Sequence, residues 1–257
     1  MKKTCQYFAL LFMLTLLVLP CTASAIGLDA GVGYWSQTPS GTFGYKEVNA
    51  NDKLDLEKDL NLDKKGQGYV RIKAELPLIL PNIYFMATPM SFTGSGTINR
   101  SINFGGQNFN NLSVPVESKL KLDHYDIAFY YTFLNLVTLG KVNVDLGLNV
   151  RYIDFEGTIS QNSLGLTASK KLSLYVPMIY AAVIVKPIST FSIEAEGRGI
   201  AIGSNSYYDV IGRLKIKPIG PLFISGGYRY ETVKINESDV KTDVKFSGPF
   251  GELGLSF

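Results

Sequence analysis

Apolar and polar residues alternate along most of this chain, and this period of two is typical of β-strands whose two faces meet different surroundings. The clearest segment is 142–152, in which the even-numbered residues are apolar or aromatic and the odd-numbered ones are Asn, Asp, Gly, Asn and Arg. The pattern predicts ten strands, at roughly 28–35, 69–76, 83–92, 124–131, 142–152, 171–180, 191–198, 208–216, 222–231 and 250–257.

One of these strands is less sharply defined, and another is assigned an apolar outward face. In 83–92 apolar residues occupy both faces, so the register stays open, and Pro89 predicts a bulge or an end outside the membrane. In 171–180 the pattern predicts an outward-facing apolar set: Leu172, Leu174, Val176, Met178 and Tyr180.

The apolar faces indicate a membrane protein that crosses with strands. After residue 25 the longest apolar run, around 179–185, is about half the length of a membrane helix. In lipid a sheet must close on itself to pair its backbone groups. The fold class is therefore expected to be all-β: a transmembrane antiparallel up-and-down β-barrel of about ten strands. Because soluble sheets also alternate, a periplasmic lipocalin-like barrel with the faces reversed is the alternative.

The other face of the clear strands collects ionisable residues, and these recur on neighbouring strands as a polar lumen would need. The predicted lumen-lining residues are Arg71, Lys73, Glu75, His124, Asp126, Asp145, Arg151, Glu194, Glu196, Arg198, Asp209, Arg213, Lys215, Arg229, Glu231 and Glu252.

Connection lengths and the last strand give the orientation. The two longest connections, 36–68 and 93–117, follow odd-numbered strands and are expected outside the cell, whereas short proline-punctuated turns face the periplasm. The chain closes on Leu253, Leu255 and Phe257, the alternating terminal strand through which we expect the barrel-assembly machinery to engage it.

The first 25 residues read as a cleaved export signal. Lys2 and Lys3 precede an apolar stretch at 8–19, and Ala23-Ser24-Ala25 forms a small-residue cleavage site. The domain plan is therefore a signal peptide at 1–25 and a barrel at 26–257, located in the outer membrane of a Gram-negative bacterium, with outer-membrane lipid around it.

Cleavage changes the composition in two ways. It removes both cysteines, Cys5 and Cys21, which excludes disulfides from the mature chain, and Pro20 argues against lipid attachment at Cys21. It also lowers the net charge from +3 to about +1, which leaves no electrostatic signature of nucleic-acid binding.

The first outer loop is expected to hold a short helix over 52–60, beside or across the barrel mouth. Leu56 and Leu60 have helical spacing, and Asp55 is a candidate N-cap. The acidic residues of this segment lack the spacing of a calcium loop, so neither a metal nor a cofactor is predicted.

Three stretches resemble a family of small, functionally uncharacterised outer-membrane β-barrel proteins of Gram-negative bacteria. They are Asp55-Leu56-x-x-Asp59-Leu60-x-Leu62, Pro77-Leu78-Ile79-Leu80-Pro81-Asn82-Ile83 and Gly227-Tyr228-Arg229. The strand-and-turn plan is similar over the whole mature chain. The resemblance implies an outer-membrane barrel and supplies no catalytic residues.

Three functions follow as hypotheses. The favoured one is a structural or surface-binding barrel without catalysis, whose narrow lumen is filled with paired charges because unpaired buried charges are costly. The second is a narrow, porin-like channel for small solutes that those charges would tune. The third is an enzyme at the outer rim that uses His124, the single histidine, beside Asp126.

Overall fold

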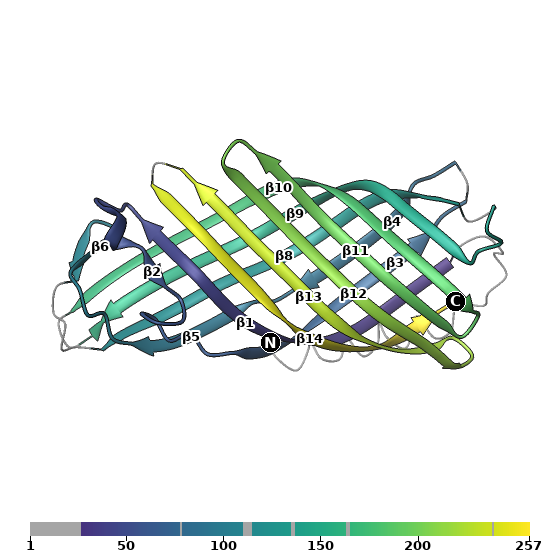
Figure 1. The fold of residues 1–257 in the computed structure, drawn as a ribbon, viewed down its shortest axis with the longest axis horizontal. Helices are drawn as coiled ribbons and strands as arrows, with labels where there is room; N and C mark the ends of the chain where they lie inside the picture. Colours follow the sequence, from purple (N-terminus) through teal and green to yellow (C-terminus); the bar gives the residue numbers. More distant parts are fainter. Residues whose placement is uncertain (1–26, 78, 110–114, 135–136, 163–164, 238) are drawn as a thin grey trace, which may run out of the picture.

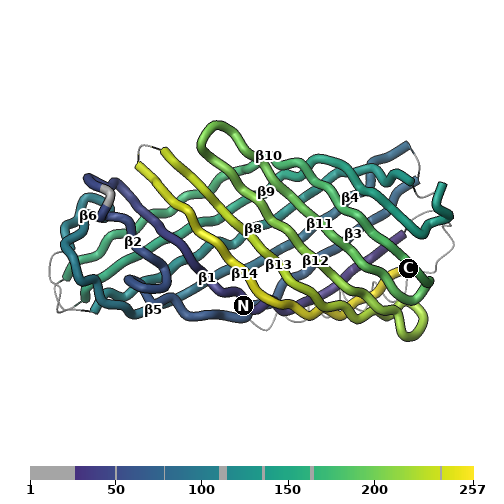
Figure 2. Tube along the Cα trace, viewed as in Figure 1, coloured from purple at the N-terminus to yellow at the C-terminus, as the bar shows by residue number. Residues whose placement is uncertain are grey.

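The computed structural model is a closed antiparallel barrel with ten strand positions (Figures 1 and 2). It describes residues 27–257 except 78, 110–114, 135–136, 163–164 and 238, so the predicted export signal at 1–25 lies outside the described residues. The barrel strands are β1 (Gly27–Tyr45), β3 (Lys65–Glu75), β4 (Asn82–Thr88), β5 (Ser91–Gly96), β8 (Val116–Phe133), β9 (Val142–Gln161), β10 (Leu166–Ile188), β11 (Phe191–Ile202), β12 (Asn205–Ile219), β13 (Leu222–Asn236) and β14 (Val240–Ser256).

Each barrel strand pairs with its neighbours, which satisfies the backbone groups that lipid cannot. Strands β4 and β5 share one position, because both pair with β8 on either side of Pro89, where an interruption is predicted. Strand β14 returns to β1, from Asp29 opposite Ser256 to Tyr45 opposite Val240. This seam closes the ring. In the part of the chain that the structure describes, no helix is long and apolar enough to cross a membrane.

The two faces of the sheet differ as predicted. Leu148 and Ile179 are 70% and 66% exposed on the outside, whereas Arg151 is fully buried inside. Tyr84, Met86, Met90 and Phe92 are buried, which fixes the open register of the third predicted strand. This arrangement contradicts the alternative of a soluble barrel with its faces reversed.

The strand β10 corrects one prediction. Met178 and Tyr180 are buried in the interior, whereas Tyr175 and Ile179 face outward, so the set of residues from Leu172 to Tyr180 was assigned to the wrong face. From Tyr175 to Ala182 both faces of this strand carry apolar or aromatic residues. The alternation of polar and apolar residues therefore could not show which face of β10 points into the barrel.

The barrel wall is uneven in height. Strands β9 and β10 stay paired up to Gln161 opposite Leu166, but β10 and β11 pair only up to Ile179 opposite Gly199. Figure 1 shows the β11–β12 hairpin ending partway along the barrel, while β8, β9 and β10 continue to the end that carries β6. The strands are longer than predicted on this side, since the alternation weakens beyond the lipid-facing segments.

The first outer loop folds over the barrel interior in a form that differs from the expected helix over 52–60. It contains a 3-10 helix, η1 (Ala50–Asp52), and a short strand, β2 (Leu54–Asp55), that pairs with β1. Asp55 accepts hydrogen bonds from the amides of Glu57 and Lys58, as an N-cap does, but only one turn follows. Four buried leucines attach this loop to the core: Leu54, Leu56, Leu60 and Leu62.

Glycines on β5 allow this close packing. A Cβ at Gly96 would lie 1.9 Å from the carbonyl oxygen of Asp59, and one at Gly94 would lie 2.3 Å from that of Leu60. The second outer loop adds the hairpin of β6 (Ile102–Phe104) and β7 (Gln107–Phe109). Its buried Phe104 and Phe109 complete the apolar cover.

A polar clasp joins the two loops. Arg100 donates to both carboxylate oxygens of Asp59, at 2.8 and 2.7 Å, and also to the carbonyls of Asn51 and Lys53. Burial opposes the charge on Asp59, but the hydrogen bonds from Arg100 and from the amide of Asp55 lower the pKa of its carboxyl. The guanidinium of Arg100 has a raised pKa for the same reason and stays charged.

The lowered pKa of Asp59 predicts an acid-sensitive loop. Its ionised form stabilises the clasp above the ordinary carboxyl pKa, and this contribution is lost as pH falls through the lowered pKa. Asp59→Asn removes the charge at every pH. We expect the variant to weaken the clasp near neutrality by about 1 kcal/mol, because Arg100 is partly exposed, and to match the wild type in strong acid.

Hydrogen exchange of residues 50–62 measures this effect, after correction for the intrinsic rate at each pH. A difference between wild type and Asp59→Asn that persisted unchanged at the lowest pH would contradict the role assigned to the carboxylate.

Candidate functional site

Oppositely charged residues face one another across neighbouring strands inside the barrel. The register places Asp126 of β8 opposite Arg151 of β9, and Arg198 of β11 opposite Asp209 of β12. Directly opposed side chains of an antiparallel pair are close enough to interact. The strand pattern alone therefore brings these charges into contact within the sheet.

Asp209 is the centre of the group. Its carboxylate accepts from Arg151 at 2.5 Å, from Arg198 at 3.2 Å and from Arg229 at 2.7 and 2.9 Å. Arg151 also donates to both oxygens of Asp126. Each of these five side chains is at most 2% exposed. Three guanidinium groups on one carboxylate form a compact, water-excluding set.

Aromatic rings cover the flat faces of the same arginines. Arg229 lies 4.5 Å from the centre of the Trp35 ring, Arg151 lies 4.8 Å from that of Tyr207, and Arg198 lies 4.8 Å from that of Tyr84. Cation–π contacts are strongest where water is excluded. Sequence reasoning did not identify these rings as partners, since it treated aromatic residues chiefly as part of the lipid-facing girdle.

A second group lies nearer the chain ends and crosses the seam. Arg71 of β3 forms a bidentate pair with Glu252 of β14 and contacts Asp29 of β1 at 2.7 Å. Tyr69 donates to Glu252 at 2.9 Å, and Lys215 of β12 reaches Asp29 across the interior. These contacts join strands that are far apart in the sequence.

The structure places fifteen of the sixteen predicted lumen residues inside the barrel, buried or nearly so. Glu75 is the exposed one, because it lines the periplasmic cavity near its opening. Among the described residues of the lumen, six buried cationic side chains face six buried carboxylates. We call these twelve residues the lumen network: Arg71, Arg151, Arg198, Arg213, Lys215, Arg229, Asp126, Asp145, Glu196, Asp209, Glu231 and Glu252.

Both ring nitrogens of His124 have partners within this interior. Nδ1 lies 3.1 Å from the carbonyl oxygen of Leu122, and Nε2 lies 3.1 Å from a guanidinium nitrogen of Arg229. The arrangement fits a neutral imidazole that donates to Leu122 and accepts from Arg229. His124 is 0% exposed, so it lies within the barrel and not at the rim.

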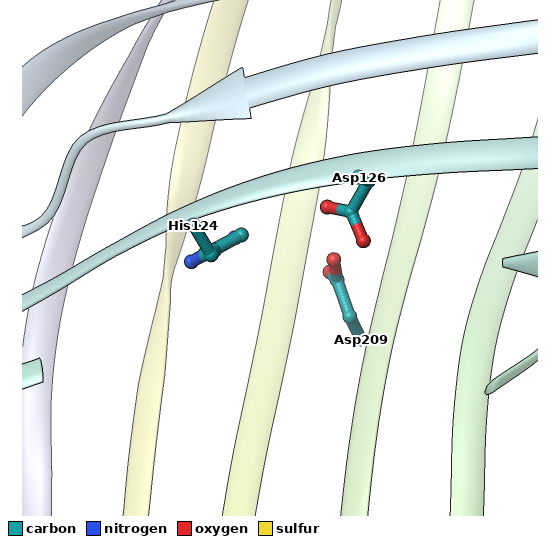
Figure 3. A group of neighbouring side chains, drawn as sticks. All are labelled: His124, Asp126 and Asp209. Carbon is teal, nitrogen blue, oxygen red and sulfur yellow. The ribbon is translucent and has the colours of Figure 1, made fainter. Parts of the chain in front are cut away.

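Figure 3 shows His124, Asp126 and Asp209 pointing toward one another, and one ligand-type atom from each lies within 4.8 Å of the others. A cation site needs free carboxylate lone pairs. Here Arg151, Arg198 and Arg229 already bind these carboxylates. The cluster therefore has the chemistry of an ion-pair network.

Two cavities lie on opposite sides of the lumen network. The periplasmic one measures about 200 Å³ and is lined by charged residues such as Lys73, Glu75 and Lys217. The extracellular one measures about 400 Å³ and is lined mainly by apolar residues such as Leu122, Leu174 and Val244. The interior thus has a charged lower part and an apolar upper part.

Comparisons with known proteins identify the fold. The structure is similar to the outer-membrane protease OmpT of Escherichia coli, with a TM-score of 0.52 and 12% sequence identity over 93% of this chain and 99% of that one. Weaker similarities are to the translocator domain of the autotransporter NalP of Neisseria meningitidis (TM-score 0.40, 9% identity, 100% and 98% covered) and to Ail of Yersinia pestis (TM-score 0.38, 12% identity, 91% and 99% covered). No family model and no curated protein matches the sequence.

The central position of Asp209 predicts a large effect of its removal. Asp209→Asn keeps the side-chain shape but leaves three guanidinium groups without their shared counter-charge. We expect a loss of about 3–5 kcal/mol in the free energy of unfolding. Unfolding in denaturant can be followed by the emission of Trp35, the single tryptophan.

Asp243→Asn is the matched control, because it removes an exposed carboxylate from β14. We expect that variant to stay within about 0.5 kcal/mol of the wild type. Equal stabilities for both variants would contradict the central role of Asp209.

The OmpT-like barrel, with its apolar outer belt and charged interior, agrees with the predicted architecture, and the chain has the fold of the Gram-negative outer-membrane β-barrels.

Proposed function

We propose that this protein is a non-conducting, non-catalytic outer-membrane barrel that binds a ligand on its extracellular side. The lumen network carries the proposal, because its side chains meet across the full width of the barrel. The contacts of His124 with Arg229 and of Lys73 with Glu196 join strands on opposite sides of the ring. Those of Arg151 with Asp209 and Glu231 join strands three and four positions apart. A solute path would have to break several buried ion pairs at once, which is costly.

The extracellular side offers a shaped and supported surface. The first outer loop is attached by four buried leucines and by the clasp of Arg100, and strands β8, β9 and β10 extend past the lipid-facing belt. Binding sites commonly lie on loops that a rigid scaffold positions. The supported extracellular surface favours a binding role, whereas the ion-paired lumen does not favour transport.

The interior gives little support to catalysis. A general base needs a ring nitrogen that can reach a substrate proton. Both nitrogens of His124 are engaged, and the carboxylates beside it are bound by arginines. We therefore assign His124 a structural role.

The terminal strand supports the expected route of assembly. Leu253 and Phe257 are 55% and 58% exposed on the outer face, and β14 forms the seam with β1. An outward-facing apolar C-terminal strand is available to the barrel-assembly machinery until closure. This partner belongs to the proposal.

Conductance in planar bilayers tests the sealed lumen. We expect the purified wild-type protein to give no steady openings at moderate voltage, while Arg213→Ala and Glu196→Ala, which disrupt the network, introduce leak. Steady wild-type openings whose size changes in these variants would establish the alternative, a narrow solute channel.

Activity measurements test the non-catalytic assignment. His124→Gln retains hydrogen-bonding capacity but cannot act as a base. We expect hydrolase and acyltransferase assays to give the same background for this variant and for the wild type. A wild-type activity that is lost in the variant would restore the enzyme hypothesis.

A further inference from the structure

The extracellular cavity is an apolar chamber lined by eight consecutive strands of the ring, from β8 through β9–β14 to β1. We call it the upper chamber. Its lining includes Phe43, Leu120, Leu122, Ile153, Phe155, Leu172, Leu174, Val176, Ile200, Val233, Ile235, Val244 and Phe246. Its volume of about 400 Å³ lies within the range of small-molecule sites. Three of the residues wrongly assigned to the lipid face of β10, Leu172, Leu174 and Val176, form part of its wall.

The upper chamber is closed below and above. The ring of Tyr207, which covers Arg151 of the lumen network, forms part of its floor. Phe43, Tyr45, Phe104 and Phe155 pack together at the end that the outer loops cover, with ring centres 5.6–5.9 Å apart. On the side of β5, Phe92 stacks on Phe246. These contacts leave the side next to β10 as the way in.

The barrel wall is split on that side. Ile179 of β10 and Gly199 of β11 form the last pair before the outer loops. Beyond it, the described residues of β10 pair with β9 but with no strand on their other side. Residues 200–202 of β11 pair only with β12. Pro177, which has no backbone N–H, lies two residues beyond the last pair. Pro177, Ile200 and Ile202 line the chamber at this split.

The split lies beside an aromatic patch on the outer surface. Tyr125, Tyr152 and Tyr175 of three adjacent strands contact one another there, with ring centres 6.2 and 5.1 Å apart. Such girdles mark the membrane interface of outer-membrane barrels. Tyr175 belongs both to this patch and to the chamber lining, so the opening faces the boundary between lipid and water.

Two lysines add charge to the outer end of the chamber, where the ammonium of Lys170 lies 5.4 Å from the centre of the Tyr45 ring. Lys170 and Lys234 line the chamber, and neither forms an ion pair with any other residue that the structure describes. An apolar interior with cationic groups at its edge is complementary to an apolar chain that ends in an anion.

We propose that the upper chamber binds the hydrocarbon chain of an anionic, single-chain amphiphile that enters from the outer leaflet through the split between β10 and the β11–β12 hairpin. This inference rests on the proposed extracellular binding function and names the class of ligand. Lys170 and Lys234 hold the headgroup at the outer end of the chamber. The lumen network below stops the chain from passing to the periplasm.

Binding of cis-parinaric acid, a fluorescent anionic fatty acid, to the full chain in lipid nanodiscs tests the proposal. We expect saturable binding to the wild type. Leu174→Trp fills the chamber and is expected to weaken binding at least about tenfold. Ile179→Trp adds the same ring to the outer face of the same strand and is expected to leave affinity unchanged.

A separate binding measurement tests the role assigned to the two lysines. We expect the double variant Lys170→Gln, Lys234→Gln to bind the acid several-fold more weakly and to bind the neutral methyl ester of parinaric acid as the wild type does. Equal losses for acid and ester would contradict the role of the two lysines.

The entry route is tested with a cysteine pair, Val176→Cys with Ile202→Cys, since residues 27–257 contain no cysteine. Tying the pair with a bifunctional maleimide is expected to slow probe uptake, while the untied pair behaves as the wild type. Unchanged uptake after tying would overturn lateral entry.

Equal affinity in Leu174→Trp and wild type, with a correctly folded variant by the heat-dependent gel shift of barrels, would overturn the chamber as the site. That result differs from the one that would contradict the sealed lumen. An open lumen would appear as conductance of the wild-type protein and would leave probe binding intact.

Discussion

A narrow barrel that carries charged residues on its inner face must neutralise them in place, because little water can reach them. Asp209 satisfies three arginines at once, and each of these arginines is also covered by an aromatic ring. The remaining architecture accommodates this requirement. Residues alternate along the strands, so that Leu148 and Ile179 face the lipid and the charged side chains pair inside the barrel.

The lumen network also divides the interior into two environments. Below it, the cavity is polar and open toward the chain ends, and above it the interior is apolar. This division explains why one strand can be charged inside at one level and apolar inside at another. In β10, Lys170 and Leu174 share the inward side with Met178, so polarity alone could not define its faces.

The sequence was sufficient for the local part of the fold. Period-two patterns located all ten strand positions, and charges such as Arg151 and Glu196 marked the inner face because a lipid-facing charge is excluded by its cost. Three features could not be obtained this way. The contacts of Arg71 with Glu252 and of Lys215 with Asp29 depend on ring closure between distant strands. The split beside Pro177 depends on how far the β9–β10 and β11–β12 hairpins extend. The conformation of the first outer loop is set by the contacts of its buried leucines with the core, although the spacing of those leucines suggested a helix.

The layout of the ion pairs has a consequence for how the chain enters the membrane. Asp126 and Arg151 belong to adjacent strands, as do Arg198 and Asp209, so each forming hairpin carries its own counter-charge. Hairpins of this kind are nearly self-neutral and can insert stepwise without exposing a lone guanidinium to hydrocarbon. The pair of Arg71 and Glu252 spans β3 and β14 and can form only when the ring shuts. Closure of the seam therefore supplies a buried ion pair that none of the separate hairpins contains.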